Sequence, residues 1–442
     1  MKHSSNSALV GMDFFTTEGP IGLMSLRSRN NREIIPSMPR RATRAWSVVG
    51  LLWIAFLINY LDRQVVFSIL PVLTRDLGFS NTQLGLPGTV FTWVYCLAMP
   101  FAGRLSDLVR RDRLVIGSII LWSLATLGTG LSGSVITFLG WRAAMGITEA
   151  LFMPAALGLI ANFHPRSTRS RALATFGTGQ FVGVALGGWF GGWAADHAGW
   201  RVGFYSLALL GFGYAALLWA AFRKHREPPE AGNRLESRSI DIIKSKSWLA
   251  LAAAFFMFCA MLWILLAWLA LFIHEKFGLT LTASGFTATV FLQAGSAAGT
   301  LAGGFLGDRA ANVVPGGRLW VGAAGLFACT PFAWFVLVAP SLYATEFCAS
   351  AFGLFGGLFI ANLYAGAYDV VSERNYGIAA GALNLLGGFA GGAGVLLTGL
   401  LNATLGVSFC IRFAAIAGAL VSVLLFAVVA RQYQSDWAAI RD

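Results

Sequence analysis

Two pairs of oppositely charged residues lie within long apolar stretches of this sequence, where a charge is costly. Asp62 and Arg63 are neighbours near the middle of the apolar stretch 46–73, and Arg142 and Glu149 lie within a second one. A charged side chain at the centre of a lipid bilayer costs about 2.5–3.5 kcal/mol on insertion scales, so such residues normally face a water-filled cavity or a partner. The carboxylates can bind and release a proton, and the planar guanidinium fork suits a carboxylate or phosphate on a substrate. These residue types therefore indicate an ion or substrate pathway.

The spacing of the second pair adds to this interpretation. Arg142 and Glu149 are seven positions apart, which is two helical turns, so both project from one face of a helix. A structural explanation stays open, in which Asp62–Arg63 and Arg142–Glu149 are neutralising pairs that lock helices together. Apolar replacement of a buried ion pair is often neutral or stabilising, so structure alone is a weak reason to keep one. We therefore predict that Asp62 and Glu149 couple transport to protons, and that Arg63 and Arg142 bind substrate.

Composition predicts a membrane protein. Of the 442 residues, 57% are hydrophobic and 12% are charged, whereas about a quarter of a soluble protein is charged. An integral membrane protein with many spans accommodates this composition, because lipid covers its apolar surface. The net charge of +12 fits the positive-inside bias of membrane proteins, and the placement of the basic residues favours that explanation over nucleic-acid binding. The five cysteines are scattered singly, so neither a disulfide framework nor a metal site is expected.

Apolar stretches long enough to cross a bilayer, roughly 20 residues each, recur about twelve times. Helices are expected in all of them, because lipid cannot satisfy open backbone groups. The sequence thus predicts an all-α membrane protein with twelve transmembrane helices in two pseudo-symmetric six-helix bundles. The stretches lie near 46–73, 83–103, 114–131, 135–163, 171–196, 201–222, 248–274, 283–307, 319–338, 342–371, 377–400 and 406–430.

Basic residues gather in alternate loops. Three connections, 103–113, 164–171 and 223–247, are rich in basic residues, whereas 74–83 and 131–134 are nearly neutral. By the positive-inside rule the basic loops are cytoplasmic, which places both termini on that side as well. We expect a multi-pass monomer in the bacterial inner (plasma) membrane.

The connections also divide the chain into parts. Residues 1–45 are polar and basic and lack the apolar core of a signal peptide, so we interpret them as a disordered cytoplasmic tail. The predicted N-terminal bundle is 46–222, the cytoplasmic linker is 223–247, and the C-terminal bundle is 248–431. A cytoplasmic tail at 432–442 follows.

The two halves share a loop motif in the same topological position. "GRLSD" (103–107) follows the second stretch and "GFLGDR" (304–309) follows the eighth. Repeated halves with a site between them at mid-membrane are typical of secondary transporters. Asp107 at a helix end can pair with Arg111 and form a latch that holds the inner side shut, with an ordinary basic loop as the alternative. The predicted gating-loop residues are Gly103, Asp107, Arg111, Gly304, Asp308 and Arg309.

Uncharged polar residues complete the predicted binding site. The spans of the second half supply no comparable central charges and offer hydrogen-bonding groups instead. Each of these residues alone can equally make a helix–helix hydrogen bond. Together they indicate a site that is charged on its N-terminal side and hydrogen-bonding on the other. The predicted substrate-binding residues of this kind are Tyr60, Tyr95, Gln180, Gln293, Asn362 and Asn384.

Other chemistries lack their motifs. No lysine completes a G-x-x-x-x-G-K-[ST] phosphate loop, and no H-E-x-x-H metal motif occurs. The sequence also contains no nucleophile–base pair at a readable spacing. We therefore expect neither an enzyme nor a bound cofactor or metal.

Five segments carry a family resemblance: "NYLDRQ" (59–64), "DLGFSNTQLG" (76–85), "GRLSDLVRRDR" (103–113), "RAAMGITEALFMPAALGLIANFHPRSTRSRALA" (142–174) and "GDRAANVVPGGRLWV" (307–321). These segments resemble the major facilitator superfamily, in particular its Spinster-like transporters and anion:cation symporters. The resemblance covers most of the chain outside the N-terminal tail. It implies two six-helix bundles that rock about a central cavity.

The resemblance also implies roles for individual residues. Asp62 and Glu149 look like proton-coupling carboxylates, and Arg63 looks like an anion-binding arginine. Arg142 would then be the charge partner of Glu149. The positions that contact sugar acids in the organic-anion branch match Gln180 and Asn384.

The sequence thus predicts a secondary active transporter that is proton-coupled and moves a small organic anion by alternating access. One alternative is a Spinster-like carrier of a lysolipid or another amphipathic solute. A second, of a different class, is a non-transporting membrane receptor on the same fold. The expected partners are the organic anion or amphipathic solute, protons and the lipid bilayer, and nucleic acid is not among them.

Overall fold

The computed structural model describes residues 38–223, 244–372 and 375–439, and the regular elements in these ranges are helices. Most of the predicted tail 1–45 and of the predicted linker 223–247 lies outside the described residues. The helices are α1 Met38–Ser68, α2 Leu70–Leu77, η1 Gln83–Gly85, α3 Leu86–Leu108, α4 Arg111–Gly130, α5 Val135–Ala150, α6 Phe152–Phe163, α7 Arg166–His197, α8 Trp200–Arg223, α9 Lys246–Phe277, α10 Leu281–Ala311, α11 Gly317–Val336, α12 Leu342–Tyr368, α13 Tyr376–Leu405 and α14 Val407–Ala438.

Two helices extend beyond the predicted bundle limits. Helix α1 begins at Met38, before position 46, because Pro39 suits a first helical turn and no breaker separates it from the apolar stretch. Helix α14 runs on to Ala438, into the predicted tail 432–442. Its Asp436 accepts a hydrogen bond from the backbone N–H of Ser247 at 2.8 Å, which ties the end of α14 to the start of α9.

Ten segments of the described chain are long and apolar enough to span a membrane. One combines η1 with α3, and another combines α5 with α6. Helices α7 and α10 have 32 and 31 residues, which is long enough, but both are rich in glycine and polar residues. The predicted twelve crossings require these two helices as spans, and the number twelve stays a prediction.

Two of the predicted stretches are broken helices. The stretch 46–73 is divided at Ile69 between α1 and α2, and the stretch 135–163 is divided at Leu151 between α5 and α6. Pro71 and Pro154 follow these breaks within the next turn. A proline has no N–H for the preceding turn and its ring clashes with the carbonyl four residues back, so the helix ends just before it. The second break leaves Glu149 in the last turn of α5.

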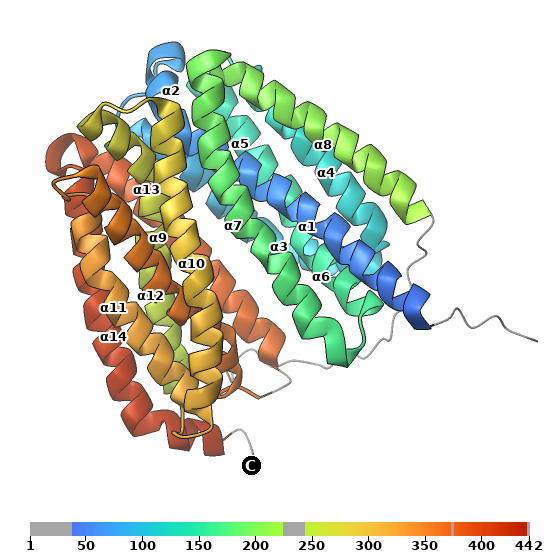
Figure 1. Ribbon diagram of the computed structural model, residues 1–442, viewed down its shortest axis with the longest axis vertical. Coiled ribbons are helices and arrows are strands. Elements are labelled where there is room, and N and C mark those ends of the chain that lie inside the picture. The colour runs from blue at the N-terminus through green and yellow to red at the C-terminus, as the bar shows by residue number, and fades with distance from the viewer. Residues whose placement is uncertain (1–37, 224–243, 373–374, 440–442) are drawn as a thin grey trace, which may run out of the picture. The chain divides into compact units, whose positions relative to one another are not determined.

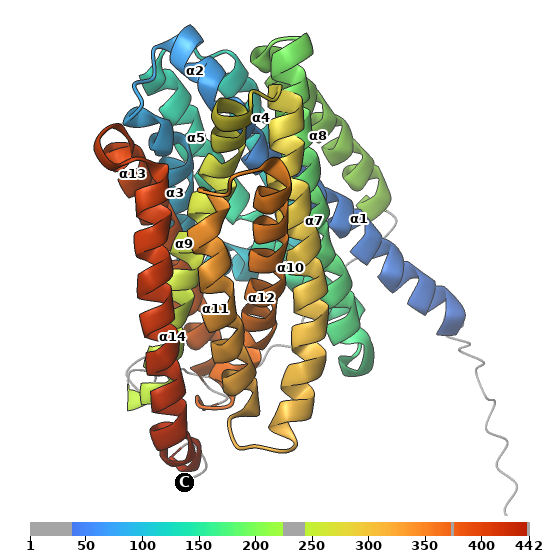
Figure 2. The same ribbon diagram turned by 60° about the vertical axis from the view of Figure 1, so that its left-hand side comes forward.

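The helices of Thr43–Asp442, which form one compact unit, pack in two groups. Helices α3 and α5 pack together in the first group, as do α4 and α8; in the second, α10 packs on α12 and α9 on α13. Between the groups, α7 contacts α10 and α3 contacts α13. Both views show α7 and α10 side by side (Figures 1 and 2). A Cβ at Gly188 of α7 would lie 2.5 Å from the carbonyl oxygen of Gly285 of α10, so glycine permits this close approach.

Hydrogen bonds join the two groups near the end that carries α2, which we call the α2 end. This end includes the last turn of α7 and the first turn of α10 (Figure 1). Asp196 accepts from the backbone N–H of Thr282 at 2.7 Å and from its hydroxyl at 2.6 Å. Farther along the same helices, Thr289 Oγ1 donates to the carbonyl oxygen of Ala185 at 3.3 Å. Thr89 of α3 donates to the carbonyl oxygen of Gly392 of α13 at 2.9 Å.

Candidate functional site

The central feature of the first helix group is an ion pair between α1 and α5. Arg63 Nε donates to Glu149 Oε2 at 2.5 Å. The side chain of Glu149 is fully buried and that of Arg63 is 8% exposed. A charge this deep in the protein is tolerated when it has a partner, and each of these residues supplies the other's. Arg63 and Glu149, both predicted from the sequence as functional, therefore lie in direct contact.

Aromatic rings surround the guanidinium of Arg63. Its carbon Cζ lies 4.8 Å from the ring centre of Tyr60, 5.0 Å from that of Phe91 and 4.4 Å from that of Tyr95. Such ring faces stabilise a cation. Nη2 of Arg63 makes no hydrogen bond to any part of the chain that the structure describes. The arginine thus keeps one donor for a further acceptor while its charge is held in place.

Phe91 is a site residue that the sequence prediction missed. It is buried and lies four residues before Tyr95 on α3, so the two side chains share a helix face. The sequence signal that could have identified Phe91 is this spacing of four from Tyr95. The sequence alone did not show that this face of α3 is turned toward Arg63.

Asp62 contacts a different helix from its neighbour Arg63. Its Oδ2 accepts a hydrogen bond from Thr126 Oγ1 of α4. Its Oδ1 is buried and has no hydrogen-bond partner among the described residues. Adjacent positions of a helix point about 100° apart, so Asp62 faces α4 while Arg63 faces α5. The neutralising pair Asp62–Arg63 considered above is therefore not formed.

The second neutralising pair considered above, Arg142–Glu149, is not formed either. It is fully buried, and its Nε donates to the carbonyl oxygen of Pro87 at 3.3 Å rather than to Glu149. Two helical turns separate the residues by about 10 Å along the axis, so a shared face does not bring their charges together. The ring centre of Phe91 lies 4.8 Å from Arg142 Cζ, so this one ring contacts the guanidiniums of both Arg142 and Arg63. In this conformation Arg142 has no exposed surface at which a substrate can bind directly.

In the second helix group, the side-chain amide of Asn362 hydrogen-bonds to the backbone of two helices. Its Nδ2 donates to the carbonyl oxygens of Gly303 of α10 and Leu358 of α12, both at 2.9 Å. The helix–helix explanation that the sequence left open therefore accounts for its amide donor. Asn362 is not brought to the Arg63 site by any contact of the described structure.

The remaining predicted polar residues differ in exposure. Asn384 of α13 is exposed, and its Oδ1 accepts a hydrogen bond from Tyr364 of α12 at 2.9 Å. Gln180 on α7 is half-buried, whereas Gln293 on α10 is buried. Tyr364 was not among the substrate-binding residues predicted from the sequence. It forms a pair with Asn384 that offers hydrogen bonds from the second helix group.

The first predicted gating loop contains the expected ion pair. Asp107 Oδ1 lies 3.6 Å from Arg111 Nη2, and the carboxylate is 57% exposed. A second ion pair in the same loop joins Arg110 Nη2 and Asp112 Oδ2 at 2.6 Å. A Cβ at Gly103 would meet no neighbour within 4 Å, so close packing does not explain this glycine in the present conformation.

The second predicted gating loop is tied to the following helix. Asp308 pairs with Arg318 of α11 at 3.0 Å, and Arg318 also pairs with Asp369 at 3.1 Å. Burial raises the pKa of Asp369, and Arg318 opposes this effect. Gly304, like Gly103, has open space where a Cβ would lie. Arg318 was not among the residues predicted for this loop.

Comparison with known proteins gives full-length relatives. The chain is 24% identical over 415 residues to the probable galactarate/D-glucarate transporter GudP of Bacillus subtilis, covering 84% of this chain and 88% of that one. It is 27% identical over 371 residues to the hexuronate transporter of Bacillus subtilis, covering 80% and 87%. It is 24% identical over 429 residues to the D-galactonate transporter of Escherichia coli, covering 88% and 97%.

Solved structures share the fold. A bacterial homolog to the human lysosomal transporter Spinster, in an inward-facing and unoccupied conformation, superposes with a TM-score of 0.72 at 21% identity. The match covers 91% of this chain and 98% of that one. The predicted all-α, multi-pass membrane fold is thereby confirmed.

The family profile described as Major Facilitator Superfamily matches residues 52–391. Together with the transporter names of the relatives, the match confirms that the chain is an integral membrane transporter and not an enzyme. Because the matched residues make up most of the chain, the protein belongs to the Major Facilitator Superfamily.

Proposed function

We propose that this protein is a secondary active transporter that moves a small organic anion together with protons by alternating access. The observation that carries the proposal is the buried Arg63–Glu149 ion pair at 2.5 Å, with Nη2 of Arg63 left without a partner in the described residues. A guanidinium held by rings and by one carboxylate can accept a second anion through its remaining donor. Arg63 is thus the anion-binding residue of the proposal.

The relatives supply the substrate class. Galactarate or glucarate, hexuronates and galactonate are named for three of them, and all are small carboxylates that carry hydroxyl groups. A carboxylate matches the fork of Arg63, and hydroxyls suit polar uncharged partners. The Tyr364–Asn384 pair of the second helix group provides such partners, and Gln180 and Gln293 are further candidates. We therefore assign a sugar acid or a similar organic anion as cargo.

Charge balance links the anion to a proton. The two carboxylates Asp62 and Glu149 balance the two guanidiniums Arg63 and Arg142, and all four side chains are buried. An added monoanion such as galactonate leaves one negative charge in excess, which a low-dielectric interior disfavours. One proton on Glu149 restores the balance and frees Arg63 for the substrate. Asp62, held by Thr126, is the second candidate for proton binding.

Alternating access requires contacts that break at one end while others form at the opposite end. Contacts between the two helix groups at the α2 end, including those of Asp196 and Thr289, support an α2 end that is closed in this conformation. The basic loops 103–113 and 164–171 lie away from the α2 end, so the positive-inside rule makes the α2 end periplasmic. We place the protein in the bacterial inner membrane with both termini cytoplasmic. The conformation described here would then be inward-facing.

The proposal is tested by uptake into proteoliposomes. Purified protein is reconstituted, a proton gradient is imposed, and labelled galactonate, glucarate and a hexuronate are offered separately. A proton symporter accumulates one of these anions above its outside concentration, and collapsing the gradient with a protonophore stops the accumulation. Equilibration without accumulation would remove proton coupling from the proposal, and no uptake with measurable binding would favour a receptor.

The alternative cargo, a lysolipid, belongs in the same assay. Likeness to the Spinster homolog at 21% identity carries the fold and not the substrate. A labelled lysophospholipid is therefore offered in parallel with the anions. Transport of the lysolipid by protein that ignores all three anions would overturn the assignment of an organic anion.

A further inference from the structure

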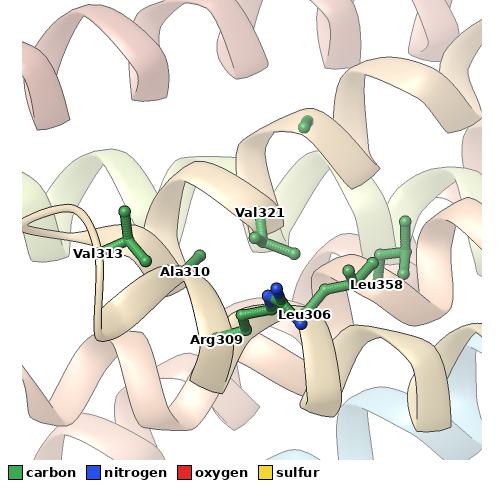
Figure 3. Close-up of a pocket in the computed structure, with 7 residues that line it drawn as sticks. Leu306, Arg309, Ala310, Val313, Val321 and Leu358 are labelled. Atoms are coloured by element: carbon green, nitrogen blue, oxygen red, sulfur yellow. The ribbon is translucent and has the colours of Figure 1, made fainter.

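A groove on the surface of the second helix group lies away from the Arg63 site. It has a volume of about 370 Å³ and lies at the end opposite α2, between the last turns of α10, the first turns of α11 and the middle of α12. Its surface is almost entirely apolar apart from one arginine (Figure 3). The lining residues are Leu306, Arg309, Ala310, Val313, Val321, Ala324 and Leu358.

Arg309 contributes the aliphatic part of its side chain to the groove and carries a positive charge beside it. Figure 3 shows its nitrogen atoms among the apolar side chains that line the groove. Its neighbour in sequence, Asp308, is bound by Arg318 at 3.0 Å, and Arg318 is bound in turn by Asp369. No ion pair of Arg309 is found within the described ranges of the chain. The nearest carboxylate along the helix is therefore engaged elsewhere, and no counterion of Arg309 lies among the residues that the structure describes.

An apolar stripe leads from Arg309 toward the middle of the membrane. Leu301, Phe305 and Arg309 follow one another at intervals of four along α10, so they share a helix face. Leu301 is 78% exposed and Phe305 is 68% exposed, while Val313 at the far end of the groove is 77% exposed. The order is a cation near the helix end and exposed apolar side chains farther in. A phospholipid has the same order, with a phosphate at the interface and acyl chains below it.

We propose that this groove binds an anionic phospholipid of the adjacent leaflet. The phosphate pairs with Arg309, and an acyl chain lies in the groove and along Leu301 and Phe305. A zwitterionic lipid offers the same acyl chain but carries a compensating positive charge, so it binds more weakly. The groove shares no lining residue with the Arg63 site, and the proposal does not depend on which solute is carried.

Native mass spectrometry of the detergent-purified protein tests the proposal. The protein is titrated with phosphatidylglycerol and, separately, with phosphatidylcholine of the same acyl chains, and the retained adducts are counted. We expect wild-type protein to retain phosphatidylglycerol preferentially. Arg309→Ala should reduce this retention about fivefold, the ratio expected for one surface arginine beside anionic headgroups. Ala324→Trp, which fills the groove and keeps the arginine, should lower retention of both lipids.

Arg431→Ala is the matched control, because Arg431 is an exposed arginine near the end of α14 that does not line the groove. It should retain phosphatidylglycerol as the wild type does. Equal retention of the two lipids by wild-type protein, or equal losses in Arg309→Ala and Arg431→Ala, would overturn the proposal. Competition by glycerol phosphate at the same concentration as the lipid would likewise show that the groove does not hold an acyl chain. Folding of each variant is checked by its melting temperature, so a misfolded variant is recognised.

Discussion

Arg63 of α1 and Glu149 of α5 form the buried ion pair of the proposed transport site, with Nε and Oε2 2.5 Å apart. The pair couples the two functions assigned to them. A substrate anion competes with Glu149 for the guanidinium, and a proton on Glu149 ends that competition. Each residue can therefore be tested by a substitution that changes one function and preserves shape.

Glu149→Gln should abolish accumulation driven by a proton gradient while exchange of substrate across the membrane continues. Glutamine has nearly the shape of protonated glutamate but cannot release a proton, so substrate binding survives and coupling is lost. Uptake and counterflow in proteoliposomes measure the two properties separately. Glu275→Gln, the same chemical change at an exposed position of α9, should leave both unchanged. Accumulation that persists in Glu149→Gln would remove this residue from the coupling role.

Arg63→Lys should weaken substrate binding strongly. A lysine keeps the charge but offers a point donor in place of the planar fork, so it cannot match the two oxygens of the substrate carboxylate. A charge-assisted hydrogen bond contributes about 1.5–3 kcal/mol, so the loss of one should raise Kd tenfold or more. Isothermal titration with the transported anion measures this change.

The control for that substitution is Arg113→Lys, because Arg113 is exposed in the first turn of α4. It should bind substrate with unchanged affinity. If Arg63→Lys also bound with unchanged affinity, Arg63 would serve only to neutralise Glu149.

Much of this site could be predicted from the sequence. Charges inside apolar stretches identified Asp62, Arg63, Arg142 and Glu149 without any tertiary information, because the cost of burying them is a property of the residues themselves. Their pairing could not be predicted in the same way. It depends on which faces of α1, α4 and α5 meet, and the break at Leu151 alters where Glu149 lies.

The second gating loop shows the same limit. The motif around Asp308 was visible, but its partner Arg318 lies ten positions later, on the next helix. A partner reached across a turn cannot be found from the spacing of residues within one helix. The groove beside Arg309 is likewise a property of three packed helices, and no pattern in one of them indicates it.

Arg318→Ala should destabilise the protein, and the effect should grow with pH. Arg318 binds two partly exposed carboxylates, and such pairs contribute about 0.2–1 kcal/mol each, so we expect a total loss of about 1 kcal/mol. Burial raises the pKa of Asp369 against the opposing effect of Arg318. When the pKa of an aspartate is higher in the folded than in the unfolded state, the folded protein becomes less stable as pH rises. Removing Arg318 takes away the effect that opposes the raised pKa of Asp369, so this loss of stability becomes larger. The melting temperatures of variant and wild type should therefore diverge above pH about 4, the ordinary aspartate range.

Arg309→Ala is the comparison for this prediction, since no ion pair of Arg309 is found among the described residues. In detergent without added lipid its melting temperature should stay close to that of the wild type at every pH. Equal destabilisation by both substitutions would contradict the assignment of Arg318 as the partner of Asp308 and Asp369.

Asp196→Ala should increase the population of the state in which the α2 end is open. The carboxylate of Asp196 accepts from the backbone N–H groups of Leu281 and Thr282, at 3.3 and 2.7 Å, and so caps the first turn of α10 from α7. Loss of a helix cap costs about 1 kcal/mol, which corresponds to a roughly fivefold shift in the equilibrium between closed and open states. Thr289→Cys, at a buried position of the α7–α10 contact, reports the change. Its labelling by a membrane-impermeant thiol reagent from the α2 side should become about fivefold faster.

Ser341→Ala is the matched control for Asp196→Ala. Ser341 caps the first turn of α12 by accepting from the backbone N–H of Ala344 at 3.3 Å, so its loss weakens a helix start within one helix group only. Thr289→Cys should then be labelled at its original rate, although the protein loses a comparable amount of stability. Faster labelling in both variants would mean that general loosening exposes Thr289. Faster labelling in Asp196→Ala alone would assign the effect to the contact between the two helix groups.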